Sequence, residues 1–579
     1  MSSKLIGPLL IALAALAAVL TTIAPDGNGP GVTCDEPYHV FQGKRLVTAL
    51  RRQGPAFFLP NNIERNFDWP LDGPPVQAPL GYWILGWTNY LFDPAPDDPL
   101  AFSIPAARFA PAAAFALLIL MVGTWTSRRE GALAGTVAAA AVALTPRLFG
   151  HAHFAALDMP TTLFFVAAVL AVAEASRSGK TWHFALAGVV WGAAMLIRLH
   201  GLLLAPPVIV WLFWRLRRRV VWPLAAWFAA GAATFFVGWP WLWLDPLGRF
   251  QQYLASGADR LSLNVFYWGQ IWADRDVPWH YPWVMFAVTV PLGLLLLGML
   301  GLWSECVAGG LARRDTHDTR RASPPATREN FHRNGDCALI AGTMFFLLLV
   351  FSWPGVPVYD GVRLFLMVFP LWAVWVGIGA RWLVESSSRV GQAQRSPTKA
   401  VQNDGGTALR LSHPTQWKSP RAILAAIVAL VALQGIGLAI YQPCHLSYYN
   451  LLAGGLAGAE RLGFEATYWG DSVREPLLAE GARLSGDAPI LFAPNLAPFQ
   501  APAVAMYSPS LNEAGVELVG EKQFEPELAD RCRYAVIYNR RANPASVVGR
   551  GKVVSEYRKQ GVWLARLVEL TAPLDEPSQ

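Results

Sequence analysis

Apolar stretches of nearly membrane-spanning length recur along most of the chain, separated by polar segments. A helix needs about 20 predominantly apolar residues to cross roughly 30 Å of hydrocarbon. The candidate spans are 5–24, 104–126, 131–146, 160–175, 183–197, 201–214, 221–243, 283–303, 337–353, 362–380 and 422–441. The first span resembles a signal peptide but lacks a clear small-residue cleavage site, so we interpret it as a retained helix. The pattern predicts a polytopic α-helical membrane protein with about 11 transmembrane helices.

The composition supports this class. Only 15% of the 579 residues are charged and 54% are hydrophobic, whereas globular chains are about 25% charged. The 25 tryptophans suit the two membrane interfaces, where amphipathic rings lie at headgroup depth. The net charge of +7 does not indicate a nucleic-acid partner, because arginine and lysine concentrate in short segments between apolar runs.

The positions of these basic residues predict the orientation. Alternate connections are rich in basic residues: Arg128 and Arg129; Arg177 and Lys180; Arg215, Arg217, Arg218 and Arg219; the stretch 313–333; and the stretch 381–421. The connections between them hold fewer basic residues for their length, around Arg147, Arg198, Arg249 and Arg363. By the positive-inside rule the first set is cytoplasmic. The amino terminus is therefore expected inside, and the segment after the last helix outside the cytoplasm.

This orientation divides the chain into a transmembrane part, 1–441, and an extracytoplasmic tail, 442–579. The polar inserts 304–336 and 381–421 are expected in the cytoplasm, with little regular structure at 311–334 and 385–420. The exterior loops are 25–103, in which Gln42–Leu59 is expected to form an interfacial helix, and 244–282, which is rich in tryptophan and tyrosine. The tail has globular composition and predicts a small α/β domain, with strands at 489–492, 534–538 and 561–567 and a helix at 475–484.

Five cysteines show no metal-ligand spacing such as a C-x-x-C pair. Cys34, Cys444 and Cys532 are all expected outside the cytoplasm. A Cys444–Cys532 disulfide that ties the tail to its entry and a pair of free thiols are both consistent with the sequence.

The acidic pair Asp35-Glu36 follows the first span closely, in the segment Thr33-Cys34-Asp35-Glu36-Pro37-Tyr38-His39. A carboxylate beside the bilayer is costly unless it faces water, a cation or a reacting group, so it is a candidate functional residue. The alternative is an ordinary solvated acid next to a proline turn.

Further polar residues are expected at the same outer end of the bundle. Asp158 precedes Pro160 at a helix start, where it is either an N-terminal cap or a reactive acid. His151 and His153 have a spacing that suits a metal or a phosphate, or they are an ordinary interfacial pair. Arg198 and His200 form the next exterior turn.

Arg363 begins the tenth span, where a guanidinium either reaches the headgroups or clamps a phosphate bidentately. Together these side chains suit transfer from a lipid phosphate. Arginines would hold the leaving phosphate while a carboxylate takes the proton of an incoming hydroxyl.

Asp35-Glu36-Pro37-Tyr38 resembles the Asp-Glu signature of the GT-C glycosyltransferases, specifically glycosyltransferase family 39. That family contains the protein O-mannosyltransferases and is close to the aminoarabinose transferase of lipid A. The similarity extends, in order along the chain, over the segments 75–83, 150–162, 198–202 and 360–363 and, more loosely, Tyr448-Tyr449-Asn450 and Tyr468-Trp469-Gly470-Asp471.

The resemblance implies a GT-C-like fold in the cell (inner) membrane and an inverting transferase that works on the extracytoplasmic face. Its donor would be a polyprenyl-phosphate-linked sugar and its acceptor a hydroxyl of a protein, lipid or glycan. Asp35 would be the catalytic acid/base with Glu36 in support, and Asp158 would lie near the acceptor or a cation. Arg363 and Arg198 would contact the donor phosphate, and Tyr38, His39, His151, His153 and His200 complete the expected substrate-binding set. The resemblance requires no cofactor and leaves room for a divalent cation.

Two other classes of function remain open from the sequence. A transporter or flippase for a lipid-linked saccharide would have a similar size and similar polar residues at the outer end of the bundle. Transporters, however, usually place charges near the bilayer midplane on broken helices and show internal repeats. A non-catalytic membrane assembly or sensor protein would act through the tail, and the polar residues at the outer end of the bundle would be dispensable for its function.

Overall fold

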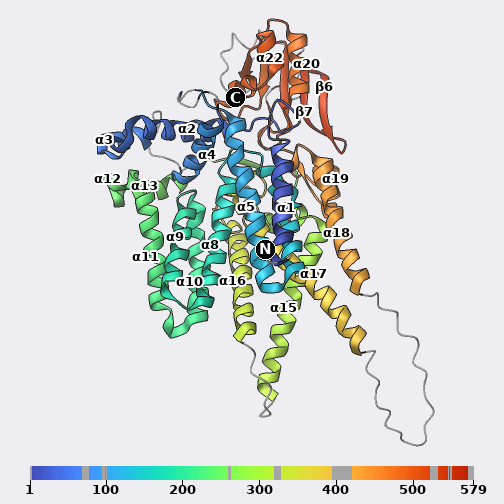
Figure 1. Ribbon diagram of the computed structural model, residues 1–579. Coiled ribbons are helices and arrows are strands. Elements are labelled where there is room, and N and C mark those ends of the chain that lie inside the picture. The colour runs from blue at the N-terminus through green and yellow to red at the C-terminus, as the bar shows by residue number, and fades with distance from the viewer. Residues whose placement is uncertain are drawn as a thin grey trace, which may run out of the picture.

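The computed structural model describes residues 3–67, 77–93, 95, 98, 101–258, 262–318, 328–393, 420–521, 532–545, 547, 549 and 551–570. Every predicted span is helical. The corresponding helices are α1 (Ser3–Leu20), α5 (Ile104–Glu130), α6 (Ala132–Ala143), α8 (Asp158–Ser178), α9 (Thr181–Met195), α10 (Ala205–Leu216), α11 (Val221–Gly238), the bent pair α14 (Tyr281–Thr289) and α15 (Leu292–Asp318), α16 (Arg328–Phe351), α17 (Val368–Ala393) and α18 (Pro420–Tyr441). They form a bundle with the tail at one end (Figure 1).

The chain is a multi-pass helical membrane protein. Among the described residues, seven helices are long and apolar enough to cross a membrane, or up to eight if the bent pair α14–α15 is one span. This is fewer than about 11 because some predicted spans end early: α6 and α9 have 12 and 15 residues. Helix α1 is also short, because its apolar part runs only from Lys4 to Leu20.

A helical arm crosses the end of the bundle that carries the tail. It consists of α2 (Glu36–Gln53), the 3₁₀ turn η1 (Gly54–Phe58), α3 (Pro60–Phe67) and α4 (Leu80–Phe92), and α2 and α3 project sideways in Figure 1. Helices α2 and α4 touch through glycines, since a Cβ on Gly86 would lie 2.1 Å from the carbonyl oxygen of Gly43. The helix predicted at Gln42–Leu59 is therefore confirmed, and it begins directly after Asp35.

The loop predicted at 244–282 also carries structure. Helix α12 (Trp241–Leu244) and α13 (Pro246–Ala258) follow α11, and then strands β1 (Asn264–Tyr267) and β2 (Gln270–Ala273) pair as an antiparallel hairpin. The predicted polar inserts are partly helical, because α15 continues to Asp318 and α16 begins at Arg328. Residues 319–327 and 394–419 of these inserts lie outside the described residues.

Charged side chains join the helices at the bundle end opposite the tail. Glu130, at the end of α5, binds Arg333 of α16 at 3.1 Å and also Arg381 of α17. Both arginines also contact Glu305 of α15. This four-residue network joins α5 and α15 to α16 and α17.

The tail contains a five-stranded mixed sheet in the order β4-β3-β5-β7-β6. Its strands are β3 (Ile490–Ala493), β4 (Leu518–Gly520), β5 (Tyr534–Tyr538), β6 (Gly551–Lys559) and β7 (Val562–Leu570). Strand β3 is parallel to β4 and β5, whereas β7 is antiparallel to β5 and β6. The helices are α19 (Gly455–Arg461), α20 (Glu475–Ser485), α21 (Gln500–Met506) and α22 (Pro509–Ala514). The three predicted strands and the predicted helix are confirmed, and β4 and β6 were not predicted.

The disulfide considered between Cys444 and Cys532 is absent. Both cysteines are buried, but they are not bonded to each other. The Cys444 thiol instead lies 3.9 Å from the carbonyl oxygen of Asp471.

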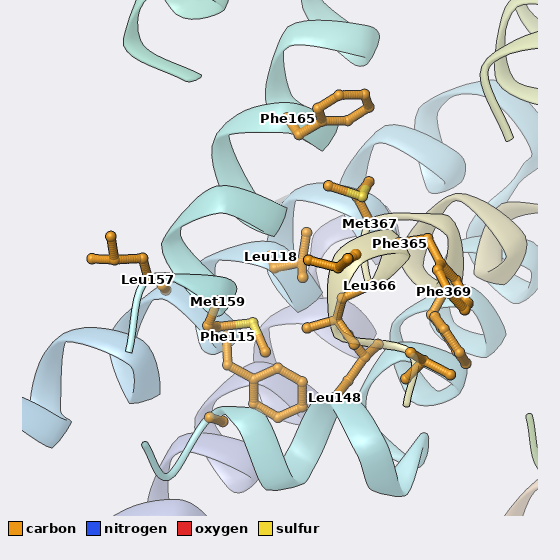
Figure 2. Packing of buried hydrophobic residues seen from close by; sticks show 14 of the residues in the cluster. Phe115, Leu118, Leu148, Leu157, Met159, Phe165, Phe365, Leu366, Met367 and Phe369 are labelled. Atoms are coloured by element: carbon orange, nitrogen blue, oxygen red, sulfur yellow. The ribbon is translucent and has the colours of Figure 1, made fainter. Parts of the chain in front are cut away.

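A hydrophobic cluster packs around the starts of α8 and α17 (Figure 2). It combines Phe115 and Leu118 of α5, Leu148 of α7 (Pro146–His151), Leu157 and Met159 around the start of α8, and Phe365, Leu366 and Phe369 near the start of α17. Because Leu157 and Met159 flank Asp158, and Phe365 follows Arg363 by two positions, tight packing of these apolar neighbours fixes the backbone that carries both charges.

Candidate active site

The guanidinium of Arg363 is the centre of a charged cluster at the tail end of the bundle. Arg363 begins the 3₁₀ turn η4 (Arg363–Phe365). Its Nε donates to Asp158 Oδ1 at 3.0 Å, its Nη1 donates to Asp360 Oδ2 at 3.2 Å, and its Nη2 donates to Asp35. Asp35 and Arg363, more than 300 positions apart in the chain, therefore meet at one end of the bundle.

Asp158 holds a second arginine. Its Oδ1 also accepts a hydrogen bond from Arg198 Nη1 at 2.6 Å, and the Asp158 side chain is only 1% exposed. Asp158 Oδ2 and Arg198 Nε are buried without a hydrogen-bond partner among the described residues. A buried polar atom that lacks a partner is costly, so these two atoms are candidates for contact with a bound ligand.

Asp35 is the most accessible carboxylate of the cluster. Its side chain is 27% exposed, against 1% for Asp158 and 7% for Asp360. Burial raises the pKa of Asp35, but the attraction of Arg363 is the largest opposing effect and the pKa ends below its usual value. Asp35 is therefore ionised at neutral pH and placed where a substrate can reach it.

Glu36 points away from this cluster, although it is adjacent to Asp35. Its carboxylate is fully buried and pairs with Arg108 of α5, whose Nε and Nη2 donate at 2.7 and 2.9 Å. It also accepts hydrogen bonds from Thr33 N, Thr33 Oγ1 and Ala155 N. Glu36 thus fastens the acidic loop to α5 and to the segment before α8, so its predicted place beside the reacting groups is not supported.

Tyr38 and His39 lie on the first turn of α2 beside Asp35. Their rings form an aromatic group with Tyr82 of α4, with centroids 5.7–6.2 Å apart. Burial lowers the pKa of His39 to about 4, despite the attraction of Asp35. A neutral imidazole is therefore expected here at physiological pH.

The two histidines predicted as a pair are separated in function. His151 is buried 5.2 Å from the ring of Trp469, and neither of its ring nitrogens has a hydrogen-bond partner among the described residues. His153 is saturated, because Nε2 bonds Thr22 Oγ1 at 2.8 Å and Nδ1 bonds the Phe149 carbonyl at 2.9 Å. Burial lowers the pKa of both imidazoles to about 4.

The ring of His200 packs 6.0 Å from that of Phe351 on α16. Across the described residues, no group of three or more histidine, cysteine or acidic side chains is arranged to hold a metal ion. The predicted metal-binding use of the His151–His153 spacing is therefore not supported, because His153 is occupied elsewhere.

The tail supplies residues that were not predicted as part of the site. The ring of Trp469 lies over Arg363, with the guanidinium carbon 4.3 Å from a ring centroid, and its indole N–H donates to Asp360 Oδ2 at 3.2 Å. Arg540 follows β5 and donates to Asp360 Oδ1 at 3.3 Å. The segment Tyr468-Trp469-Gly470-Asp471 resembled the family only loosely, and nothing in the sequence near Arg540 indicated its role.

Comparison with known proteins finds a family that matches part of the chain. Residues 75–243 match the family described as dolichyl-phosphate-mannose-protein mannosyltransferase. The resemblance predicted from the sequence is confirmed over these residues. None of the curated proteins matches the chain significantly by sequence.

Several solved structures are similar. ArnT from Cupriavidus metallidurans in the apo state gives a TM-score of 0.44 at 14% identity, covering 98% of both chains. Its form bound to undecaprenyl phosphate gives 0.42 at 15% identity, covering 98% of this chain and 99% of that one. The oligosaccharyltransferase AglB from Archaeoglobus fulgidus, in complex with an inhibitory peptide and a dolichol-phosphate, gives 0.45 at 13% identity, covering 92% of this chain and 69% of that one.

Proposed function

We propose that this chain, whose residues 75–243 belong to the dolichyl-phosphate-mannose-protein mannosyltransferase family, moves a sugar from a polyprenyl-phosphate donor to an acceptor hydroxyl. The observation that carries the proposal is the meeting of an accessible carboxylate, Asp35, with two arginines, Arg198 and Arg363, around Asp158 at one end of a membrane bundle. A base beside a phosphate-binding cation is the arrangement that this reaction requires.

The proposed step is a single displacement. The acceptor oxygen attacks the anomeric carbon of the sugar, and the bond from that carbon to the phosphate oxygen breaks. The electron pair leaves with the phosphate, and the acceptor proton passes to the Asp35 carboxylate. A single displacement inverts the anomeric configuration, and arginines stabilise the charge that grows on the leaving phosphate.

The contacts of Arg363 suggest how the phosphate enters. All three guanidinium nitrogens are engaged by carboxylates, and Asp35 is the most exposed of these partners. We expect the donor phosphate to take the place of Asp35 at Nη2 while Asp158 and Asp360 continue to hold Nε and Nη1. The same exchange releases Asp35 to accept a proton.

An apolar groove in the bundle suits the isoprenoid chain of such a donor. It has a volume of about 350 Å³ and lies between α10 and α16, lined by Pro206, Pro207, Val210, Trp211, Trp214, Ala338, Leu339, Gly342 and Phe346. The 3₁₀ segment η2 (Leu199–Leu204) leads directly from Arg198 into α10. A phosphate at Arg198 and a lipid chain along α10 are therefore compatible.

In this proposal, the distribution of basic residues determines on which side of the membrane the site lies. The four-residue network of Glu130, Glu305, Arg333 and Arg381 lies at the end next to the arginine-rich connections. The positive-inside rule assigns that end to the cytoplasm, and hence the site and the tail to the extracytoplasmic face.

The test is to incubate the purified full-length protein in liposomes with a panel of radiolabelled polyprenyl-phosphate sugars and membrane extracts as acceptors. Transfer of label to protein, lipid or glycan supports the proposal and identifies the acceptor class. Label that crosses the liposome membrane without transfer would instead make the chain a transporter. Asp35→Asn is the matched inactive variant, because it keeps the shape of the side chain.

A further inference from the structure

Trp469 of the tail makes contacts with both halves of the charged cluster. It is fully buried. Its carbonyl oxygen accepts a hydrogen bond from Cys34 N at 3.3 Å, next to Asp35, while its ring covers the guanidinium of Arg363. One residue of the tail thus contacts both the acidic loop and the arginine that pairs with it.

The neighbouring backbone of the tail reinforces this contact. Gly31 N donates to the carbonyl oxygen of Asp471 at 2.8 Å, so the chain before Asp35 is hydrogen-bonded to the tail at two points. Gln500 of α21 donates from Nε2 to the carbonyl oxygen of Trp469 at 3.1 Å. The position of Trp469 is therefore fixed by the tail itself and does not depend on Arg363.

Asp360 links the tail to Arg363 by a second route. Its carboxylate accepts hydrogen bonds from Trp469 and Arg540 of the tail and from Arg363 of the bundle, all between 3.2 and 3.3 Å. Asp360 has a φ of +55°, which non-glycine residues adopt at a cost. The strained turn is held in place because the tail supplies two of the three donors to its carboxylate.

The other side of the same turn is blocked by the bundle. Gly361 has a φ of +67°, and a Cβ there would lie 2.7 Å from Nη1 of Arg147. Arg147 is itself fixed by hydrogen bonds of 3.3 Å to the carbonyl oxygen of Tyr448. The turn 359–361 is therefore confined between Arg147 and the two tail residues Trp469 and Arg540.

From these contacts we infer that Trp469 and Arg540 are positioning residues of the transferase site, which set the plane of the Arg363 guanidinium for the donor phosphate. The inference rests on the proposed function. It assigns the tail, for which the sequence predicted only a small α/β domain, a role in donor binding. Arg363 is oriented along its edge by carboxylates and across its face by an indole, and the indole comes from a different part of the chain.

A desolvated cation–π contact and a hydrogen bond to a charged group are each worth about one factor of ten in affinity. Trp469→Leu removes both and should raise the KM for the donor by about 30-fold to 100-fold, with the KM for the acceptor unchanged. Trp469→Phe keeps a ring over Arg363 but loses the N–H to Asp360, so it should recover most of this loss. Arg540→Gln should raise the donor KM by about tenfold.

Trp563 on β7 offers a matched control elsewhere in the tail. Its ring lies 4.1 Å from the guanidinium carbon of Arg566, away from the site, so Trp563→Leu removes an equivalent contact without touching Arg363. The measurements are the donor and acceptor KM values, the dissociation constant for undecaprenyl phosphate, and the melting temperature of each full-length variant in detergent. The control should bind and turn over the donor as the wild type does.

The outcomes separate the two proposals. If the wild type neither binds undecaprenyl phosphate nor transfers any sugar, the proposed function fails. If the wild type is active and Trp469→Leu, folded, has an unchanged donor KM, the positioning inference is overturned. If Trp469→Leu does not fold, Arg540→Gln decides in the same way, because an unchanged donor KM in that variant would overturn the inference. Where Trp469→Leu folds, a double-mutant cycle of Trp469→Leu with Arg363→Ala in melting temperature needs no ligand, and zero coupling there would also overturn the inference.

Discussion

Glu36→Gln tests whether two adjacent acids have different roles. The substitution keeps the size and shape of the side chain but turns one acceptor oxygen into a donor. Five donors converge on the Glu36 carboxylate: two from Arg108, two from Thr33 and one from Ala155. Whichever oxygen becomes the amide NH₂, it faces a guanidinium N–H and a backbone N–H.

The magnitude follows from this geometry. At least two hydrogen bonds are lost at a buried site, and each bond to a charged group contributes about 1.5–3 kcal/mol. Breaking a buried ion pair by removing one partner costs about 3–5 kcal/mol, because Arg108 remains buried without its counter-charge. We expect Glu36→Gln to lower the stability by about 3–5 kcal/mol. With an unfolding entropy of about 2.1 cal/mol/K per residue, the melting temperature should fall by about 3 °C or more.

The assay is thermal unfolding of the full-length protein in detergent, paired with sugar transfer measured well below the melting temperature. Glu64→Gln is the control in the same loop, 25–103, because the Glu64 side chain is 62% exposed and lies 3.5 Å from Arg249. It should change the stability by no more than about 0.5 kcal/mol. A Glu36→Gln protein that melts like the wild type but transfers no sugar would refute the structural assignment and return Glu36 to the catalytic set.

Three further predictions address the site and the tail. Asp35→Asn should lower sugar transfer by at least about 100-fold with the fold intact; retained turnover would remove Asp35 from the mechanism. Arg363→Ala should raise the donor KM by about tenfold to 100-fold and leave the acceptor KM nearly unchanged, whereas equal effects on both would indicate a purely structural arginine. Burial raises the pKa of Asp471 to about 6, whereas an aspartate in the unfolded chain has a pKa of about 3.9. Between about pH 3.9 and pH 6 the folded protein therefore holds a proton that the unfolded chain has released. The free energy of unfolding falls as the pH rises through this range. Asp471→Asn should lack this dependence and melt higher than the wild type at about pH 8 but not at about pH 4.5; parallel curves for the two proteins would contradict the assignment.

The helices were predictable because their signal is local. Apolar runs of bilayer length appear directly in the sequence, and every predicted span is helical. The count of full spans was less accurate because α6 and α9 are short, and hydropathy alone does not show how far a helix continues. In the tail, β6 escaped prediction because its side chains are mostly exposed, so it lacks the apolar run that marks β3 and β5.

The sequence predicted those site residues whose location depends on the order of the helices. It did not predict contacts that depend on how side chains pack. Asp35, Asp158, Arg198 and Arg363 were predicted at one end of the bundle, and hydrogen bonds join all four. The pairing of Glu36 could not be predicted because its partner Arg108 lies inside an apolar helix, 72 positions away, with no local sign of a buried ion pair. Trp469 and Arg540 were missed because only the docking of the tail brings them to Asp360.

The four-residue network at the opposite end of the bundle has a consequence for biogenesis. Glu130 ends α5, the first of the seven membrane-length helices to be synthesised, yet its partners Arg333 and Arg381 are made more than 200 residues later. During translation this carboxylate must wait at the aqueous boundary, where water solvates it. The first helices can therefore insert and pack early, but the charged network that joins them to the later helices can close only after α16 and α17 have entered the bilayer, so truncated nascent chains that stop before Arg333 should leave Glu130 without its arginine partners.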